Sequence, residues 1–241
     1  EATGFFADGE KASVHIKAGA KHVVITAPAK GDVTTALIGV NDDRFKTPLC
    51  ITSNASCTTN SVAPVMAILH ENLGIQKASM MTVHSYTATQ KLVDGPDAKD
   101  FRRGRAAAVN IVPSSTGAAE AVVQTIQDLK GKFDAVSVRV PSITGSLSVI
   151  TALVNKPTTR EEVNALFVSA EQSPRWSKIL HVTKDELVSS DIIGEPYGAI
   201  VDSLLTKVTD GNLVTVFSWY DNEYGYTATL VEHVRRIGNV I

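Results

Sequence analysis

The sequence predicts a chain that begins as an α/β fold and continues as an α+β fold, with a mostly antiparallel sheet and helices. Three observations predict this. Apolar, β-branched runs before residue 53 are typical of strands buried on both faces of a parallel sheet. Later strands follow one another through turn residues, and Asp210-Gly211 is a strong hairpin signal. Helical patterns separate the two groups and close the chain.

Composition excludes several classes of protein. The chain has 241 residues, of which 44% are hydrophobic and 20% charged, as in an ordinary soluble globular protein. Its net charge of −2 gives no general reason to bind nucleic acid or anionic membranes. It has no apolar run of transmembrane length and no signal-peptide pattern, so we expect no membrane partner and a cytoplasmic location. Cys50 and Cys57 are too few for a disulfide framework and match no metal-ligand spacing, so we expect no metal.

The first part of the chain carries the parallel-sheet signals. Residues 10–18 are ambiguous between a short helix and a strand, and strands are expected at 22–28, 36–40 and 49–52. The chain lacks a starting Met, and its first residues read like the end of a strand and a turn. We therefore expect upstream sequence that is missing here.

A helix is predicted from Cys57 to about Asn72, because Val62, Val65, Met66 and Leu69 fall at helical spacing. Gly74 is a plausible residue to end it, and Pro64 is expected to kink or break it. A strand over 78–83 ends at His84. The loop from 85 to 108 is long enough to be functional.

The remaining elements follow in order. The sequence predicts a helix at 118–129, strands at 133–140 and 146–154, a helix that a capping box opens at Thr159, short strands around 180 and 200, strands at 204–208 and 213–220, and a helix at 223–237 that buries Leu230, Val234 and Ile237.

The candidate nucleophile is Cys57, at the junction of a strand and a helix N-terminus. Peptide dipoles and free N–H groups there favour a thiolate, and Ser56 and Thr58 add hydroxyls beside a potential anion site. The alternative is a buried cysteine behind a Ser/Thr cap. His84 ends a strand and is the best placed base. The other histidines (15, 22, 70, 181 and 233) are interpreted as solvated or capping residues.

Anion recognition is the second signal. Arg102, Arg103 and Arg105 cluster at the end of the long loop, and Arg139 lies at the end of a strand. The segment 114–117 precedes a helix, so its N–H groups can hold a phosphate. Each feature alone has a structural explanation. Together with Cys57 they favour cysteine chemistry on a phosphorylated substrate.

Several motifs together resemble phosphorylating glyceraldehyde-3-phosphate dehydrogenase, in order over essentially the whole chain. They are Ser53-Asn-Ala-Ser-Cys-Thr-Thr-Asn60, His84-Ser-Tyr-Thr-Ala-Thr-Gln90, residues 102–108, Pro113-Ser-Ser-Thr-Gly-Ala-Ala119, residues 132–141, and Trp219-Tyr-Asp-Asn-Glu-Tyr-Gly-Tyr226. The resemblance implies a Rossmann-type dinucleotide-binding domain followed by a catalytic domain. It divides the chain into 1–56, the C-terminal part of the first domain, 57–220, the catalytic domain, and 221–241, a helix returning to the first.

The resemblance also implies roles for single residues. Cys57 would attack the aldehyde and carry a thiohemiacetal and then a thioester, with His84 as its base. Thr87 and Arg139 would bind the substrate phosphate. Inorganic phosphate would meet Ser56, Thr58, Arg103, Thr116 and Gly117. The cofactor would meet Thr3, Gly4, Thr26, Ala27, Asn222 and Tyr226.

The implied function is the NAD-dependent oxidative phosphorylation of D-glyceraldehyde 3-phosphate in glycolysis or gluconeogenesis, by a cytoplasmic homotetramer. NADP is not excluded, because the family's G-x-G-x-x-G turn and ribose-binding acid are absent here. The alternatives are an erythrose-4-phosphate dehydrogenase, an inactive fragment acting only in assembly or binding, and, more weakly, a cysteine hydrolase. The stretch Ser142 to Ile150 departs from the family's usual sequence, with an effect that the sequence does not reveal.

Overall fold

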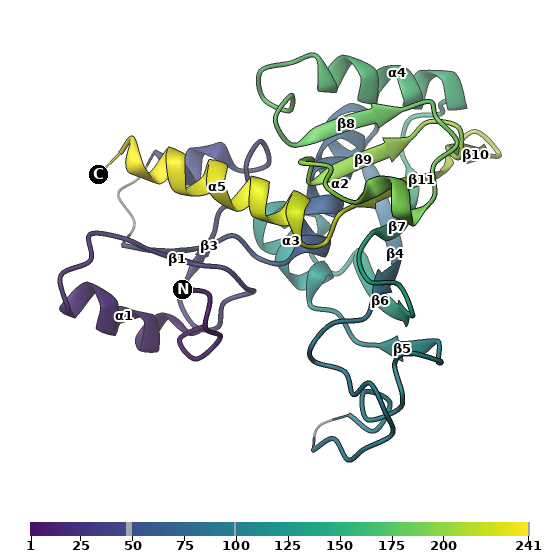
Figure 1. Ribbon diagram of the computed structural model, residues 1–241. Helices are drawn as coiled ribbons and strands as arrows, with labels where there is room; N and C mark the ends of the chain where they lie inside the picture. The colour runs from purple at the N-terminus through teal and green to yellow at the C-terminus, as the bar shows by residue number, and fades with distance from the viewer. Residues whose placement is uncertain (47–49, 99, 241) are drawn as a thin grey trace.

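The computed structural model describes residues 1–46, 50–98 and 100–240. The chain begins with a small parallel sheet in the strand order β1-β3-β2, beside helix α1 (Gly9–Lys17) (Figure 1). Its strands are β1 (Val23–Ile25), β2 (Thr34–Thr35) and β3 (Ile51–Ser53). The predicted first and third strands are therefore present, except that Leu49 lies outside the described residues. The carboxyl ends of β1 and β3 lie side by side, because Ile25 pairs with Ser53.

The second part is an eight-stranded sheet in the order β5-β6-β4-β7-β11-β9-β8, with β10 paired to β11. Most neighbours are antiparallel, while β4 and β6 and also β8 and β9 run parallel. The predicted hairpin joins β10 and β11, and its turn residues Asp210 and Gly211 both have positive φ, of 49° and 73°. The strands are β4 (Ile75–Ser85), β5 (Val112–Ser114), β6 (Phe133–Val140), β7 (Ser146–Val154), β8 (Leu180–Thr183), β9 (Ala199–Asp202), β10 (Lys207–Thr209) and β11 (Leu213–Tyr220).

One face of this sheet carries the main core. Helix α2 (Cys57–Leu73) packs against β7 and β11, α3 (Ala118–Thr125) against β6, and α4 (Arg160–Glu171) against β8. Helix α2 is buried almost all round, since α3 and α4 also contact it, and this explains why both its apolar and its hydroxyl-bearing side chains are covered. Short 3-10 turns complete the fold at Asp42–Phe45, Gln127–Leu129 and Ser189–Ile192.

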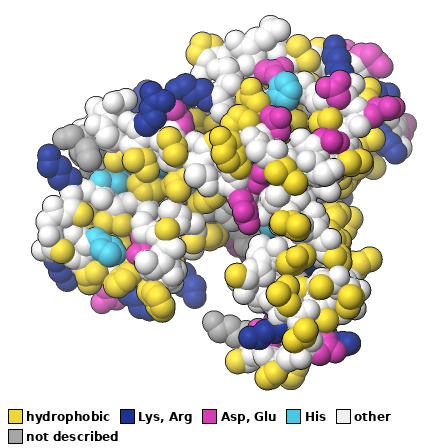
Figure 2. All heavy atoms as spheres, in the orientation of Figure 1, with side chains coloured by type: hydrophobic (Ala, Val, Ile, Leu, Met, Phe, Trp, Pro, Cys, Tyr) yellow, Lys and Arg dark blue, Asp and Glu magenta, His cyan; other side chains and the backbone are white. Residues whose placement is uncertain are grey.

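The other face of the large sheet is apolar and open. The pairing register places Val136, Met81, Val149 and Phe217 in one row across β6, β4, β7 and β11. Met81 is 42% exposed and Val136 44%. The helices of the larger unit lie on the opposite face or at its end (Figure 1), and yellow side chains gather along the corresponding margin in Figure 2.

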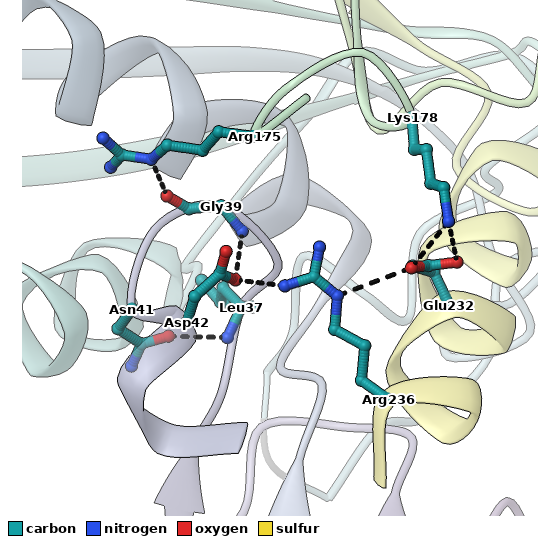
Figure 3. Close-up of polar contacts among 8 residues, drawn as sticks. All are labelled: Leu37, Gly39, Asn41, Asp42, Arg175, Lys178, Glu232 and Arg236. Atoms are coloured by element: carbon teal, nitrogen blue, oxygen red, sulfur yellow. Dashed lines mark hydrogen bonds and ion pairs between the residues drawn. The ribbon is translucent and has the colours of Figure 1, made fainter. Parts of the chain in front are cut away.

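Helix α5 (Tyr224–Gly238) returns from the large sheet to the small one (Figure 1). Arg236 Nη1 of α5 lies 2.6 Å from Asp42 Oδ1, and Lys178 Nζ lies 3.0 Å from Glu232 Oε1 (Figure 3). Charged contacts thus join α5 to the 3-10 turn that begins at Asp42 and to the loop before β8. The predicted domain division at 56 and 220 stays a prediction, which this return of α5 supports.

The strand predicted at 36–40 is wrong. The strand is β2, two residues long, and the chain then turns. The turn forms because Asn41 Oδ1 accepts from Leu37 N and Asp42 Oδ1 accepts from Gly39 N, while Gly39 has φ 77°. Leu37 and Ile38 are buried, so the apolar run serves the core without being a strand.

Three helix predictions need correction, and one ambiguity is resolved. The break allowed at Pro64 is wrong, because α2 runs unbroken through it under packing from several sides. The helix predicted over 118–129 ends at Thr125, and a 3-10 turn follows. Val234 is 50% exposed, because the buried row of α5 falls every four residues at Gly225, Thr229, His233 and Ile237. Residues 10–17 are helical, since Asp8 Oδ1 caps α1 by accepting from Glu10 N.

Candidate active site

The turn between β3 and α2 presents Cys57 at the first position of the helix. Ala55 has φ 54°, a left-handed conformation that is uncommon for a residue other than glycine. Ser56 is the N-cap, and its Oγ accepts from Thr59 N at 3.1 Å. The Tyr226 hydroxyl donates to the Ala55 carbonyl at 3.1 Å, which ties the turn to α5.

His84 reaches Cys57 from the end of β4. Its Nε2 lies 3.4 Å from Cys57 Sγ, so the predicted pair is in contact. The parallel register of β4 and β6 places Arg139 beside His84. His84 Nδ1 lies 2.7 Å from the Ser85 carbonyl oxygen, and Arg139 Nη1 lies 3.1 Å from the same oxygen and 2.8 Å from Nδ1.

Two contacts at Nδ1 favour opposite tautomers of His84, since Arg139 Nη1 can only donate to it and the Ser85 carbonyl oxygen can only accept from it. We assign the proton to Nδ1, because Arg139 Nη1 also has the Ser85 oxygen as an acceptor. If Nδ1 carried a lone pair, it would face a carbonyl oxygen at 2.7 Å, and two acceptors would repel. With the proton on Nδ1, the imidazole donates to Ser85 O, and Arg139 donates to the same oxygen. Assigned from this network, Nε2 has its lone pair directed at Cys57 Sγ. His84 is thus arranged as a proton acceptor.

The surroundings of the pair shift the pKa values of both side chains. Burial raises the pKa of the Cys57 thiol, although contacts with Thr58 and the charge of Arg139 act in the opposite direction. Burial, with the Arg139 charge second, lowers the pKa of His84 to about 4. Burial and the helix N-terminus thus act in opposite directions on this thiol, and the thiolate expected from the sequence stays a prediction.

Tyr220 is a site residue that sequence reasoning placed in a motif but gave no role. Its hydroxyl lies 3.0 Å from Thr58 Oγ1 and 2.7 Å from Thr82 Oγ1, and its ring meets His84 edge-on with centroids 5.9 Å apart. Burial raises its pKa far above the usual value, so it is a neutral donor. Its position at the end of β11, directly before the Asp221-Asn222 turn, was the available signal.

Two guanidinium groups converge beside the pair. Arg139 is next to His84, and the charge of Arg103 is close enough to lower the pKa of Arg139 further, after burial. Arg103 Nη2 donates to Ser114 Oγ of β5 at 3.3 Å. Thr87 follows on the loop, with its hydroxyl 2.9 Å from that of Thr89. Two neighbouring cations of this kind suit a phosphate dianion.

The structure places the other candidate anion ligands at two helix N-termini. Ser56 and Thr58 flank Cys57 itself, and Thr58 is buried against Tyr220. Gly117 is the N-cap of α3, and Thr116 Oγ1 accepts from Ala118 N at 3.2 Å. Thr116 and Gly117 therefore belong to a separate helix start, and their role stays a prediction.

The candidate cofactor residues of the first unit gather near the end of β1. Thr26 donates through both its N–H and its hydroxyl to the carbonyl of Glu1, whose side chain in turn accepts from Thr3 and Gly4. The Ala27 carbonyl accepts from Ser53 Oγ at 2.7 Å. In open α/β sheets ligands bind at the carboxyl ends of the strands, which is where β1 and β3 end here.

Asn222 is held by the stretch 142–150, whose effect the sequence did not reveal. Its Oδ1 accepts from Ser146 Oγ at 2.9 Å and from Gly145 N at 3.2 Å. Thr144 donates to the neighbouring Asp221 carboxylate at 2.9 Å. This stretch thus fixes the amide oxygen of Asn222, and none of these contacts uses the amide nitrogen.

Figure 2 shows a hollow between the unit that holds β1 and β3 and the long loop after β4. Among residues 1–46, 50–98 and 100–240, no group of three or more His, Cys, Asp or Glu side chains could hold a metal ion. Across the same ranges, no helix is both long and apolar enough to cross a bilayer.

The fold and the paired side chains define a class, the α/β enzymes in which a cysteine at a helix N-terminus works beside a histidine. Residues 56–222 match the family described as "Glyceraldehyde 3-phosphate dehydrogenase, C-terminal domain". The chain is 48% identical to a glyceraldehyde-3-phosphate dehydrogenase of Mycobacterium avium, over 99% of this chain and 69% of that protein. It is 45% identical to one of Atriplex nummularia, over 98% of this chain and 65% of that protein. It is 45% identical to one of Neurospora crassa, over 100% of this chain and 70% of that protein.

The chain therefore belongs to the glyceraldehyde-3-phosphate dehydrogenase family. It spans about two thirds of the length of these relatives, 65% to 70%.

Proposed function

We propose that this chain carries out the oxidative phosphorylation of D-glyceraldehyde 3-phosphate to 1,3-bisphosphoglycerate with NAD. The observation that carries the proposal is the Cys57–His84 contact of 3.4 Å, with Arg139 beside it and Arg103 near. A thiol, a base and two cations in one place meet the needs of acyl transfer on a phosphorylated aldehyde.

In this reaction Cys57 Sγ attacks the aldehyde carbon as its proton passes to His84 Nε2. The protonated Nε2 then donates to the oxygen of the thiohemiacetal, so one side chain serves as base and as electrostatic partner. The acyl group is held on sulfur as a thioester, whose energy an oxygen ester would not retain. Attack by inorganic phosphate on the thioester releases the acyl phosphate and returns Cys57.

Two phosphates require two anion sites. We assign the substrate phosphate to Arg139 and Thr87, because Arg139 is fixed beside His84 by the β4–β6 register. We assign inorganic phosphate to Ser56, Thr58, Arg103, Thr116 and Gly117, which bring helix N-termini and a guanidinium. Holding both reactants near one sulfur lowers the entropic barrier to their meeting.

The residues around the Cys57 turn fit a dinucleotide. Thr26 and Ala27 end β1 beside β3, Asn222 has its amide oxygen fixed by Ser146, and Tyr226 lies against Ala55. We propose that these residues, with Thr3 and Gly4 at the edge of β1, hold NAD. When bound, NAD would supply the acceptor for the hydride that leaves the thiohemiacetal carbon, which is the two-electron oxidation that gives the thioester. The Gly95-Pro96 pair resembles that of NAD-preferring members of the family, and the choice of NAD over NADP belongs to this proposal.

We also propose that the protein is a cytoplasmic homotetramer. A relative in Dianthus caryophyllus, 44% identical over 98% of this chain, is described as cytosolic. The open row of Val136, Met81, Val149 and Phe217 on the large sheet supports association with further copies of the chain, since such rows are usually covered.

The test compares Cys57→Ser with Cys50→Ser in NAD reduction assays that contain glyceraldehyde 3-phosphate with and without phosphate. We expect Cys57→Ser to lose at least about a thousandfold in kcat, since it loses the nucleophile. Cys50 is exposed and serves as the matched control, with activity like that of the wild type. Activity that survives in Cys57→Ser, or turnover to acid that ignores phosphate, overturns the proposal. Faster turnover of erythrose 4-phosphate in the same assay would instead assign the substrate of the rival enzyme.

A further inference from the structure

A row of buried polar side chains crosses from the first unit to α5. His22 Nε2 lies 2.9 Å from Thr52 Oγ1, and Thr52 Oγ1 lies 2.8 Å from His233 Nε2. On the other side of the ring, His233 Nδ1 lies 3.1 Å from Asn54 Oδ1. Thr52, Asn54 and His233 are fully buried, each with 0% exposure. The interpretation of His233 as a solvated or capping residue is therefore wrong.

The donor and acceptor assignments along this row of hydrogen bonds are consistent with one another. Asn54 Nδ2 donates to Thr229 Oγ1 at 3.3 Å, so Asn54 Oδ1 is the atom that accepts from His233 Nδ1–H. A neutral His233 then accepts at Nε2 from the Thr52 hydroxyl, and Thr52 accepts from His22 Nε2–H. The row of hydrogen bonds continues within α5, where the Thr229 hydroxyl donates to the Tyr226 carbonyl at 2.7 Å. A protonated His233 would break it, because both rings would then direct N–H groups at Thr52.

This row ends at the turn that presents Cys57. Asn54 directly precedes the strained Ala55, and its backbone N–H donates to the Ile25 carbonyl at 3.0 Å. The Asn54 carbonyl accepts from Asn60 Nδ2 of α2 at 2.8 Å. The backbone of the turn is thus held by β1 and α2, and the Asn54 side chain by α5.

We propose that His233 is a positioning residue for Cys57, which acts through Asn54 to hold the 54–56 turn in the conformation that places Cys57 Sγ against His84. This inference rests on the proposed role of Cys57 as the nucleophile. His233 touches neither reacting atom. Replacing it is therefore expected to change the geometry and reactivity of the Cys57 thiol and to leave the binding of both phosphates unchanged.

The surroundings of His233 keep it neutral over the working range of pH. The charged and titratable groups that face it are His22 across Thr52 and Arg236, whose guanidinium lies over the ring of Phe45 that meets His233 edge-on. Burial, followed by the charge of His22, lowers the pKa of His233 to about 4. The row of hydrogen bonds from His22 to Asn54 therefore stays intact near neutral pH.

The test measures alkylation of Cys57 by iodoacetamide across about pH 6 to pH 9, with peptide mass spectrometry to separate Cys57 from Cys50. Exposed Cys50 reports on the reagent in every sample. The variants are His233→Leu, which removes both ring nitrogens, and His233→Asn, whose amide N–H takes the place of Nδ1–H. Ile237→Ala is the matched control, since it loosens the same buried row of α5 one turn further on without touching the polar contacts.

We expect His233→Leu to slow alkylation of Cys57 about fivefold or more near pH 7 and to shift the midpoint of its pH profile, while His233→Asn restores most of the rate. Ile237→Ala should change the rate less than about twofold at a comparable loss of stability. If circular dichroism shows His233→Leu to be unfolded, Thr52→Val replaces it, with a smaller change in the same direction.

A Cys57 rate and midpoint in His233→Leu within about twofold of those of Ile237→Ala would overturn the inference. Failure of the proposed function looks different. In that case Cys57 would be alkylated no faster in the wild type than in His84→Asn, and the residue at position 233 would make no difference to this comparison.

Discussion

At the scale of single residues, the site is a thiol in contact with a buried imidazole. Burial moves the two pKa values apart, raising that of Cys57 and lowering that of His84 to about 4. A base needs only a free lone pair, which the Nδ1–H tautomer provides at Nε2.

His84→Asn should slow the alkylation of Cys57 by about tenfold or more near pH 7, because the amide cannot accept the thiol proton. Iodoacetamide trapping followed by peptide mass spectrometry measures this rate. His181→Asn is the control, since His181 pairs with Glu171 on the surface, away from Cys57. Equal rates in the wild type and His84→Asn would remove His84 from the role of base.

At the scale of elements, α5 is the part that joins the two units. It sends Tyr226 to the Ala55 carbonyl, His233 to Thr52, and Arg236 to Asp42 (Figure 3). Asp42 also accepts from Gly39 N, so one carboxylate closes a turn and receives the helix. The orientation of α5 thus depends on polar contacts at its buried face, in which apolar side chains are few.

Arg236→Met should lower the free energy of unfolding by about 1 to 2 kcal/mol, because Asp42 loses a partner in a partly buried contact. Arg235→Met is the matched control on the same helix, since Arg235 is 71% exposed and lies 3.8 Å from Glu232. Its cost should stay below about 0.5 kcal/mol. Urea titrations followed by fluorescence of Trp176 and Trp219 measure both, and equal losses in the two variants would contradict the account of α5 docking.

At the scale of the whole molecule, two sheets of different construction meet at one turn. The small parallel sheet ends at Ser53, and the large sheet brings His84 and Arg139 to the same place through the β4–β6 register. Helix α2, buried between α3, α4 and the large sheet, fixes the position of Cys57. The stability of the fold at low pH and its association with further copies depend on this arrangement of both sheets.

Acid should destabilise the fold through its buried histidines. The pKa of His84 and of His233 is about 4 in the folded chain, against 6.5 when exposed. Between these values the unfolded chain binds more protons, so stability is full above pH 6.5 and falls as pH falls towards 4. Each histidine contributes about 2 kcal/mol of this loss between about pH 7 and pH 5. Urea titrations at both pH values should show a smaller loss in His233→Leu, and the same loss in both proteins would refute the assignment.

Met81→Lys should weaken the proposed tetramer, because it places a charge in the centre of the open row on β4. Sedimentation velocity of the wild type and the variant at one concentration measures the change in oligomeric state. Val231→Lys, at an exposed position on α5, is the control. A wild type that sediments as a monomer, or a tetramer that tolerates Met81→Lys, would contradict the proposed interface.

Local signals predicted much of the fold. The strands at 133–140 and 146–154, the hairpin at Asp210-Gly211 and the capping box at Thr159 were confirmed with their predicted bounds or chemistry. Periodicity, turn residues and caps act within a few residues, so the sequence reports them directly. The same signals failed at residues 36–40, where side chains of Asn41 and Asp42 bend an apolar run away from extended backbone.

The pairing of Cys57 with His84 was predicted from motifs, whereas the burial of the pair was not. A helix N-terminus is visible in the sequence, but the burial that opposes its effect on the thiol depends on Tyr220 and on strands distant along the chain. His233 shows the same limit, since nothing near it in the sequence indicates Thr52 or Asn54. Residue order decided which groups are available for chemistry. Only the tertiary packing decided their solvation, because desolvation and hydrogen-bond direction arise from partners brought together by the fold.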